Sequence, residues 1–196
     1  MPIDLPITDW PLPYVDRLEE RALADVDLVV VHCTELPDLA MARQYGERIL
    51  YVDSGSGNSG HYYIDRDGRV LQFVPIERVA HHTRGFNPRS IGIELVNTGR
   101  YPDWLDSRQQ SMSEPYTAEQ LDALAALLLA LRHRVPALKR IAGHEDLDLS
   151  MEVASDDPKR SVRRKRDPGP LFPWSRFESL GLDRIAQPDT PLIDRP

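Results

Sequence analysis

Short runs of apolar and β-branched residues, separated by stretches of helical character, constrain the fold of this chain most strongly. The run DVDLVVVHC predicts a buried strand that ends near His32, and SIGIELV and KRIAGH predict two further strands. Helices are expected between these runs, in PDLAMARQYGERI and in the stretch that follows Thr117. Strands that alternate with helices indicate an α/β fold, here a single-domain mixed β-sheet with helices packed on its faces.

Local signals mark a hairpin and the two ends of the longest helix. Two β-rich runs flank Asp67-Gly68 in GHYYIDRDGRVLQFVP, and this dipeptide supplies the positive φ that a hairpin turn needs. The hydroxyl of Thr117 can cap a helix while Gln120 reaches back, and Pro136 ends that helix. The apolar face of the helix is expected to carry Leu121, Leu124, Ala125, Leu128, Leu131 and Val135.

The other segments carry weaker patterns. The stretch from about residue 98 to 116 and the segment EDLDLSMEVASDDPKRSVRRKRD have no periodicity, so both are expected to be irregular loops. PWSRFESLG predicts a short final helix. Prolines are concentrated near both ends of the chain, which predicts an extended arm at 1–25, one domain at 26–182 and a tail at 183–196.

Charge and cysteine content narrow the classes of function. The 24 Lys and Arg residues against 31 Asp and Glu give a net charge of -7, which argues against non-specific binding to nucleic acid or to an anionic membrane. Cys33 is the only cysteine, so an intramolecular disulfide is excluded. The opening stretch has no basic start and no unbroken apolar run, and no other segment has the apolar length of a membrane span. A cytoplasmic location is therefore expected.

Two histidines and one aspartate stand where a metal site could be built. His32 and His144 each end an apolar run where a polar loop begins, and Asp167 precedes Pro168-Gly169, which would restrict the direction of its carboxylate. Each residue also has a simpler interpretation, because strand-end histidines are often structural and Asp-Pro pairs are common in turns. Residue types alone leave both interpretations open.

Five sequence blocks in a fixed order resemble one known family. VVHCTE, GHYYIDRDGRVLQFVP, AHHTRGFNPRSIGIELV, IAGHEDLD and RKRDPGPLFPW are similar to the type-2 family of N-acetylmuramoyl-L-alanine amidases, to which phage amidase lysozymes and peptidoglycan recognition proteins are related. The similarity extends from about Val29 to Trp174. It implies the α/β fold of that family and a zinc-dependent enzyme that hydrolyses the amide bond between N-acetylmuramic acid and L-alanine.

The resemblance also implies the metal ligands. In such amidases zinc is bound by the histidine of the first block, the histidine of the GH block and an acid or thiolate before the Pro-Gly pair. These positions match His32, His144 and Asp167 here. Two imidazoles and one carboxylate leave a fourth tetrahedral position open, as in catalytic zinc sites. Cys33 follows His32 along a strand, so its side chain is expected on the opposite face, in the core.

Further matches imply the groups that act on the substrate. Glu94 matches the family's catalytic acid, and a strand flanked by Ile93 and Leu95 would surround it with apolar groups that raise its pKa. The alternative is a solvent-facing glutamate on that strand. Lys165 matches the family's basic residue that stabilises the developing oxyanion, and an extended segment would place it on the same side as Asp167. The arginines around Lys165 can equally be a solvated charge run.

Two histidines are assigned to substrate binding. His82 matches the histidine of the family's AWHAG block, with His81 where tryptophan is common, and is expected to line the cleft and contact the substrate. His61 opens the hairpin, and a structural or supporting role is the alternative for it. Gly60 stands where some relatives carry a catalytic tyrosine, which places the role of base on Glu94.

One segment departs from the family pattern. The 22 residues between His144 and Asp167 exceed the short gap typical of the family, so the segment from about Leu149 to Val162 resembles an insertion that could reshape the pocket rim.

The expected substrate is a soluble muropeptide or peptidoglycan fragment, as for the AmpD-like recycling amidases, with no nucleic-acid or membrane partner. The alternatives are a lytic amidase that acts on polymeric cell wall and a non-catalytic peptidoglycan-binding module.

Overall fold

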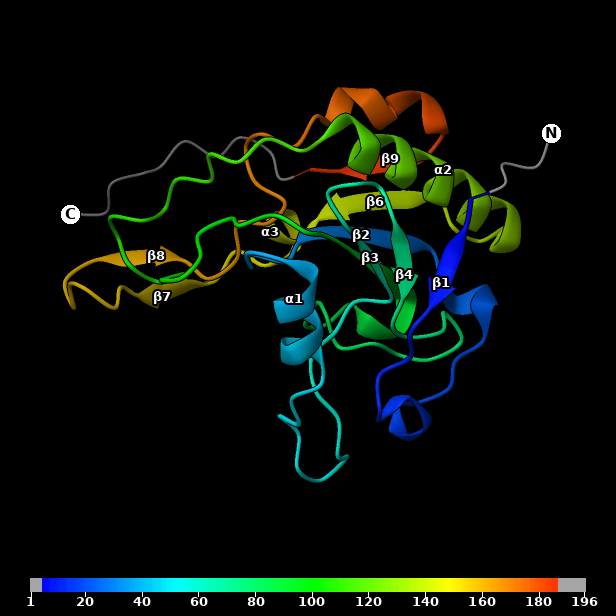
Figure 1. Cartoon of the computed structure of the whole chain (residues 1–196), viewed down its shortest axis with the longest axis horizontal. Coiled ribbons are helices and arrows are strands. Elements are labelled where there is room, and N and C mark those ends of the chain that lie inside the picture. The colour runs from blue at the N-terminus through cyan, green and yellow to red at the C-terminus, as the bar shows by residue number, and fades with distance from the viewer. Residues whose placement is uncertain (1–4, 187–196) are drawn as a thin grey trace.

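Seven strands of the described chain form one mixed β-sheet. The structure, a computed structural model, describes residues 5–186. From edge to edge the strand order is β1-β4-β3-β5-β2-β6-β9, and β1 and β4 run opposite to the other strands (Figure 1). The strands are β1 (Ile7–Asp9), β2 (Leu28–Cys33), β3 (Tyr62–Ile64), β4 (Val70–Gln72), β5 (Ser90–Leu95), β6 (Arg140–Gly143) and β9 (Asp183–Ile185).

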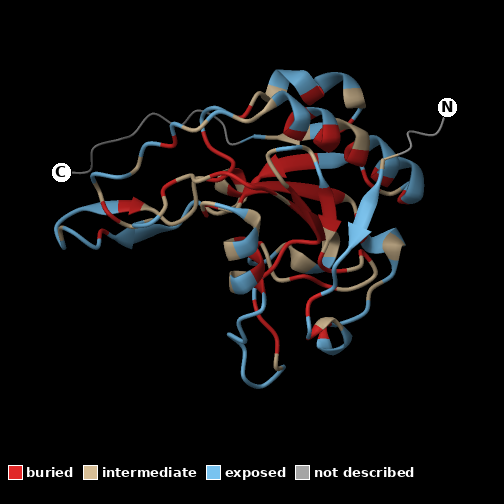
Figure 2. Cartoon of the chain, viewed as in Figure 1, coloured by how far each residue is buried: buried red, intermediate tan, exposed pale blue. Residues whose placement is uncertain are grey.

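Helices cover both faces of the sheet, as the sequence predicts. α2 and η4 lie on one face, where Leu124 joins a buried cluster with Val29 and Ile93, and α1 lies on the other, where Ala42 joins a cluster with Tyr63. Figure 2 shows that the central strands between these layers are almost entirely buried, whereas the edge strand β1 is exposed. The helical elements are α1 (Leu39–Gly46), α2 (Ala118–Arg134), α3 (His144–Leu147), and the 3-10 helices η1 (Val15–Arg17), η2 (Leu23–Asp25), η3 (Asn87–Arg89) and η4 (Trp174–Leu180).

Helix α2 begins where its sequence predicts. The Thr117 hydroxyl accepts a hydrogen bond from the Gln120 N–H, and the Gln120 side chain accepts one from the Thr117 N–H, which completes the capping box. The buried Gln120 amide also donates to the carbonyls of Ile64 and Val96. The first turn of the helix is thereby tied to the carboxyl ends of β3 and β5, beside the functional site.

The strands predicted from apolar runs are confirmed as β2, β5 and β6. The predicted hairpin is formed by β3 and β4, which pair antiparallel around Asp67 and Gly68 with Gly68 at φ 81°. The predicted final helix is the 3-10 helix η4. Among the described residues, none of the helices combines the length and the apolar character that crossing a bilayer requires.

The segment after His144 is more ordered than its sequence predicts. Instead of an irregular loop, it forms α3 and then an antiparallel hairpin of β7 (Met151–Val153) and β8 (Ser161–Arg163), which projects from the body of the protein (Figure 1). Each strand has three residues, and β7 is exposed throughout, so no apolar alternation marks the hairpin in the sequence. The hairpin largely coincides with the insertion-like segment at 149–162.

The proline-rich ends do not form separate arms where the structure describes them. β1 pairs with β4 at one edge of the sheet, and Leu12, Tyr14 and Leu18 are buried in the cluster that includes α1. β9, inside the predicted tail, pairs with β6. The predicted boundaries at 26 and 182 are therefore corrected, because short edge strands pair through backbone groups that side-chain patterns do not reveal. Residues 1–4 and 187–196 of the predicted arm and tail lie outside the described residues.

Candidate metal centre and active site

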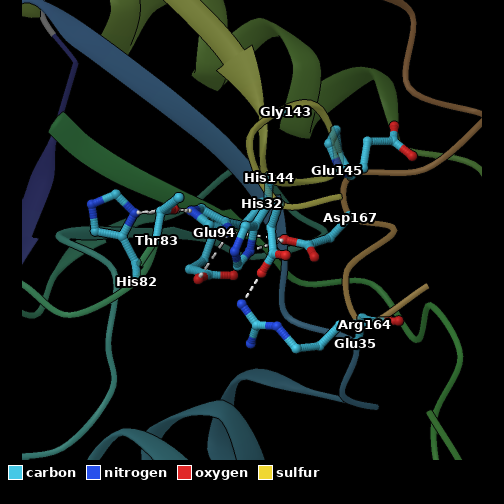
Figure 3. Close-up of polar contacts among 12 residues, drawn as sticks. His32, Glu35, His82, Thr83, Glu94, Gly143, His144, Glu145, Arg164 and Asp167 are labelled. Atoms are coloured by element: carbon cyan, nitrogen blue, oxygen red, sulfur yellow. Dashed lines mark hydrogen bonds and ion pairs between the residues drawn. The ribbon is translucent and has the colours of Figure 1, made fainter. Parts of the chain in front are cut away.

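Three predicted metal ligands meet at the carboxyl ends of the central strands (Figure 3). His32 lies on β2, His144 opens α3 directly after β6, and Asp167 lies on the segment that follows β8. One ligand atom from each residue lies within 4.8 Å of the other two, and all three residues are buried. The Oδ2 atom of Asp167 is 2.8 Å from Nδ1 of His32 and 3.2 Å from Nδ1 of His144. The fold therefore joins residues 135 positions apart in one compact donor set.

This donor set fits a tetrahedral zinc ion. Atoms bound to zinc at about 2.0 Å lie roughly 3.3 Å from one another in a tetrahedron, which is close to the two distances from Oδ2 of Asp167 to the histidine Nδ1 atoms. An imidazole lone pair that faces a carboxylate oxygen at 2.8 Å requires a cation or a proton between them. Within residues 5–186, the buried Oδ1 of Asp167 and Nε2 of His144 have no hydrogen-bond partner. The observed atoms thus suit a site for a cation.

Burial and neighbouring charges favour the protonation states that bind metal. Burial lowers the pKa of His32 to about 4, so its imidazole is neutral at pH 7. Burial raises the pKa of Asp167, but the charge of His144 and hydrogen bonds from both histidines outweigh this effect and hold the pKa well below its usual range. Neutral imidazole and ionised carboxylate are the forms that coordinate a metal ion.

Glu94 lies beside the metal ligands on the same face of the sheet. Its Oε1 is 3.9 Å from Nδ1 of His32. Burial, followed by the charge of Asp167, raises the pKa of Glu94 to about 8, while the charge of Lys165 lowers it. Gly60 lies against this side chain, because a Cβ at Gly60 would stand 2.8 Å from Cγ of Glu94. A carboxyl group with such a pKa can accept and release a proton near neutral pH.

A cleft of about 480 Å³ brings the predicted catalytic and metal-binding residues together. Lys165 lines this cleft with Glu94 and with His32, His144 and Asp167. Lys165 and Asp167 reach the same cleft from one chain segment, as the resemblance implies. The two predicted metal-binding imidazoles, the carboxyl groups of Asp167 and Glu94 and the ammonium group of Lys165 therefore face a common space.

His82 lies on the other side of His32 from Asp167. Its Nδ1 is 3.0 Å from Nε2 of His32, and His82 lines the cleft (Figure 3). Burial and the neighbouring histidines hold the pKa of His82 well below its usual value. The structure thus places His82 in the cleft, in direct contact with a proposed metal ligand.

His61 does not line this cleft. It is fully buried, its Nδ1 accepts a hydrogen bond from the Gly92 N–H at 3.0 Å, and its Nε2 is 3.0 Å from the carbonyl oxygen of Arg78. Both ring nitrogens are therefore used by the backbone. The structure corrects the assignment of His61 to substrate binding and supports the alternative, a structural role. His61 lies directly before β3, so the alternation of side chains along that strand does not determine where the His61 side chain points.

A buried ion pair that supports the ligand segment was missed from the sequence. The Arg100 guanidinium donates to the Glu35 carboxylate at 2.6 and 2.8 Å, and neither side chain is more than 7% exposed. The same guanidinium donates to the main-chain carbonyls of Arg163 and Arg164, immediately before Lys165. The pair connects the loop after β2 with the segment that carries Lys165. Arg100 lies in the irregular stretch at 98–116, where neither periodicity nor a family block indicated it.

Comparisons with known sequences agree with the geometry of this site. Residues 22–170 match the family model described as N-acetylmuramoyl-L-alanine amidase. The chain is 34% identical to the 1,6-anhydro-N-acetylmuramyl-L-alanine amidase AmpD of Enterobacter cloacae over 126 residues, which cover 60% of this chain and 54% of that protein. The chain therefore spans about half the length of the curated relatives it matches.

Solved structures show the same architecture. The crystal structure of a selenomethionine derivative of AmpD has a TM-score of 0.60 and 26% identity, with 89% of this chain and 93% of that chain covered. AmiD from E. coli, in complex with the substrate anhydro-N-acetylmuramic acid-L-Ala-D-gamma-Glu-L-Lys, has a TM-score of 0.60 and 25% identity, with 83% and 60% covered. Because the family model matches most of its length, this chain belongs to the N-acetylmuramoyl-L-alanine amidase family.

Proposed function

We propose that this chain is a zinc-dependent amidase that hydrolyses the bond between N-acetylmuramic acid and L-alanine in peptidoglycan fragments. The observation that carries the proposal is the grouping of the His32, His144 and Asp167 donor set with Glu94 and Lys165 in one cleft. The relatives are named as N-acetylmuramoyl-L-alanine amidases, and one similar structure holds an anhydro-muramyl peptide as substrate. A non-catalytic binding module would not need all five groups.

His32, His144 and Asp167 are the residues that would hold zinc. A zinc ion bound there supplies a Lewis acid that polarises the amide carbonyl and makes a water molecule more acidic. Three protein ligands are one fewer than a tetrahedral ion takes, and all three line the cleft. The substrate can therefore reach the open side of the site.

Glu94 is the proposed proton carrier. Its position near the donor set and its raised pKa suit a group that accepts the proton of the attacking water. The same carboxyl group then donates this proton to the nitrogen of L-alanine as the carbon–nitrogen bond breaks. Water thus adds to the carbonyl carbon, the lactyl group becomes a carboxylate, and the peptide leaves as an amine.

Lys165 is proposed to stabilise the charge that develops on the carbonyl oxygen. Its ammonium group belongs to the cleft that holds Glu94 and the metal ligands. A fixed positive charge near that oxygen is worth more in a partly desolvated cleft than in water. The Arg100 hydrogen bonds to the two preceding carbonyls support the backbone from which Lys165 projects.

Soluble muropeptides in a cytoplasmic recycling role are the proposed substrates. The net charge of -7 gives the protein no general attraction to an anionic wall polymer. Several relatives are named as amidases of 1,6-anhydro-N-acetylmuramyl-L-alanine. These two observations favour small fragments over intact wall as the substrate.

The central test is incubation of the zinc-loaded protein with a defined anhydro-muramyl tripeptide and identification of the products by mass spectrometry. We expect anhydro-N-acetylmuramic acid and the free tripeptide. A strong chelator should abolish cleavage, and zinc added back should restore it. Binding of the substrate without cleavage by the zinc-loaded protein would identify a binding module instead, and cleavage at another bond would refute the proposed specificity.

A further inference from the structure

We propose that His82 and Ser90 are positioning residues that fix the ring orientation and the tautomer of His32. Polar contacts run in sequence from His32 through His82 and Ser90 to the carbonyl oxygen of Phe86. The inference rests on the proposed metal site for its consequence. It concerns side chains that do not themselves bind the metal, and it replaces substrate contact as the main role of His82.

The last contact, between Ser90 and the Phe86 carbonyl, determines which group donates in each of these hydrogen bonds. A carbonyl oxygen can only accept, so the Ser90 hydroxyl, 2.8 Å from the Phe86 oxygen, donates to it. Ser90 Oγ is then free to accept, and Nε2 of His82 lies 3.2 Å away. His82 therefore carries its proton on Nε2. A neutral imidazole has one N–H, so Nδ1 of His82 is left as an acceptor.

This polarity determines the tautomer of His32. Nδ1 of His82 faces Nε2 of His32 at 3.0 Å, and two lone pairs at that distance would repel each other. The proton between them must belong to Nε2 of His32. The Thr83 hydroxyl lies 3.0 Å from Nδ1 of His82 and 3.4 Å from Nε2 of His32. It can donate a second hydrogen bond to Nδ1 of His82, and Nε2 of His32 remains the donor in the contact between the two histidines. Nδ1 of His32 is then left with the free lone pair, which a cation bound between this atom and Asp167 would take up.

Backbone packing holds the His82 ring where the hydrogen bonds need it. A Cβ on Gly92 would stand 2.6 Å from Cγ of His82, so the ring rests directly on the Gly92 backbone of β5. The Asn87 carboxamide oxygen accepts hydrogen bonds from the backbone N–H groups of His82 and Thr83 at 3.0 and 2.7 Å. The loop that carries His82 is therefore fixed from two sides.

A preset tautomer has a direct consequence for metal binding. Metal-bound histidines generally donate their second N–H to a fixed partner, and loss of such a partner typically costs about 10–100-fold in metal affinity. His82 supplies this partner for His32, and Ser90 in turn keeps His82 in its accepting form. The two residues thus act through His32 and not on the substrate.

The first test measures zinc affinity by competition with a chromophoric chelator in His82→Ala, His82→Asn and, as a control, the exposed His133→Ala. The carboxamide oxygen of asparagine can take the place of imidazole Nδ1 as an acceptor. We expect His82→Ala to lose about 10–100-fold in affinity, His82→Asn to recover most of it, and His133→Ala to match the parent. Thermal unfolding of the zinc-free variants checks that each remains folded.

A second readout does not depend on activity. Nitrogen-15 NMR of the zinc-loaded protein should show neutral His82 protonated on Nε2, and Ser90→Ala should shift His82 towards a mixture of tautomers. His82 protonated on Nδ1, parental zinc affinity in His82→Ala, or failure of His82→Asn to recover affinity would each overturn the proposal. If the parent binds zinc but cleaves no muropeptide, the proposed function fails while zinc affinity and the NMR result still decide the role of His82.

Discussion

Glu94 stands directly opposite His32 in the parallel register of β5 and β2. Residues in register on neighbouring strands point to the same face of a sheet, so the proposed proton carrier and a proposed metal ligand emerge side by side. Tyr63 on β3 continues the same row, opposite Glu94. The distance of 3.9 Å between Glu94 Oε1 and His32 Nδ1 is therefore set mainly by strand pairing, which is more rigid than a loop.

Replacement of this carboxylate should separate chemistry from metal binding. Glu94→Gln keeps the size of the side chain but removes its basic oxygen, so we expect turnover to fall by roughly two powers of ten or more. Zinc content and folding should not change. Steady-state rates on an anhydro-muropeptide, with zinc measured on the same sample, check this, and the exposed Glu119→Gln is the matched control. Near-parental turnover in Glu94→Gln would assign the base to another group.

Removal of a proposed ligand should abolish tight zinc binding. His144→Ala leaves one imidazole and one carboxylate to bind zinc. Loss of a hydrogen-bond partner of a metal ligand lowers metal affinity by about 10–100-fold, and we expect loss of the ligand itself to lower zinc affinity further. Competition with a chelator measures this loss, and His133→Ala controls for removal of an imidazole elsewhere. If His144→Ala retained zinc as tightly as the parent, the assigned donor set would be wrong.

The buried pair of Arg100 and Glu35 should matter for stability. Arg100→Met leaves the Glu35 carboxylate buried without its partner, and breaking a buried pair in this way costs about 3–5 kcal/mol of unfolding free energy. The double variant with Glu35→Gln should lose less than Arg100→Met alone, because no charge remains buried. Urea unfolding followed by circular dichroism measures both values. A loss below about 1 kcal/mol in Arg100→Met would place the pair in the range of exposed salt bridges.

Substrate form distinguishes recycling from wall lysis. We expect faster cleavage of soluble anhydro-muropeptides than of insoluble sacculi at equal concentration of the scissile bond, because a protein with a net charge of -7 has no general attraction to an anionic polymer. Rates of release of new amino groups from both substrates provide the measurement. A clear preference for sacculi would contradict the recycling role and leave the amidase chemistry in place.

The sequence by itself determined the elements whose signals lie close together in the chain. Thr117 and Gln120 mark the start of α2 because a capping box joins residues three positions apart. The apolar runs before His32 and around Ile93 mark β2 and β5 because burial between two helical layers leaves a continuous apolar stretch. The ordered family blocks also indicated the residues that the fold brings into one cleft, since each block carries its own residue pattern.

Only the tertiary structure decided which way several side chains face and how the edges of the sheet are completed. β1, β9 and the β7–β8 hairpin were not predicted, because these short strands pair through backbone groups and carry no apolar alternation, whereas the equally short β3 and β4 are marked by the turn between them. His61 and His82 belong to neighbouring blocks, yet one bonds to the backbone in the interior and the other contacts His32. The role of Arg100 in supporting the Lys165 segment is visible only from its hydrogen bonds to the main-chain carbonyls of residues 163 and 164. These outcomes depend on contacts between residues far apart in the chain, whose relative positions no local pattern specifies.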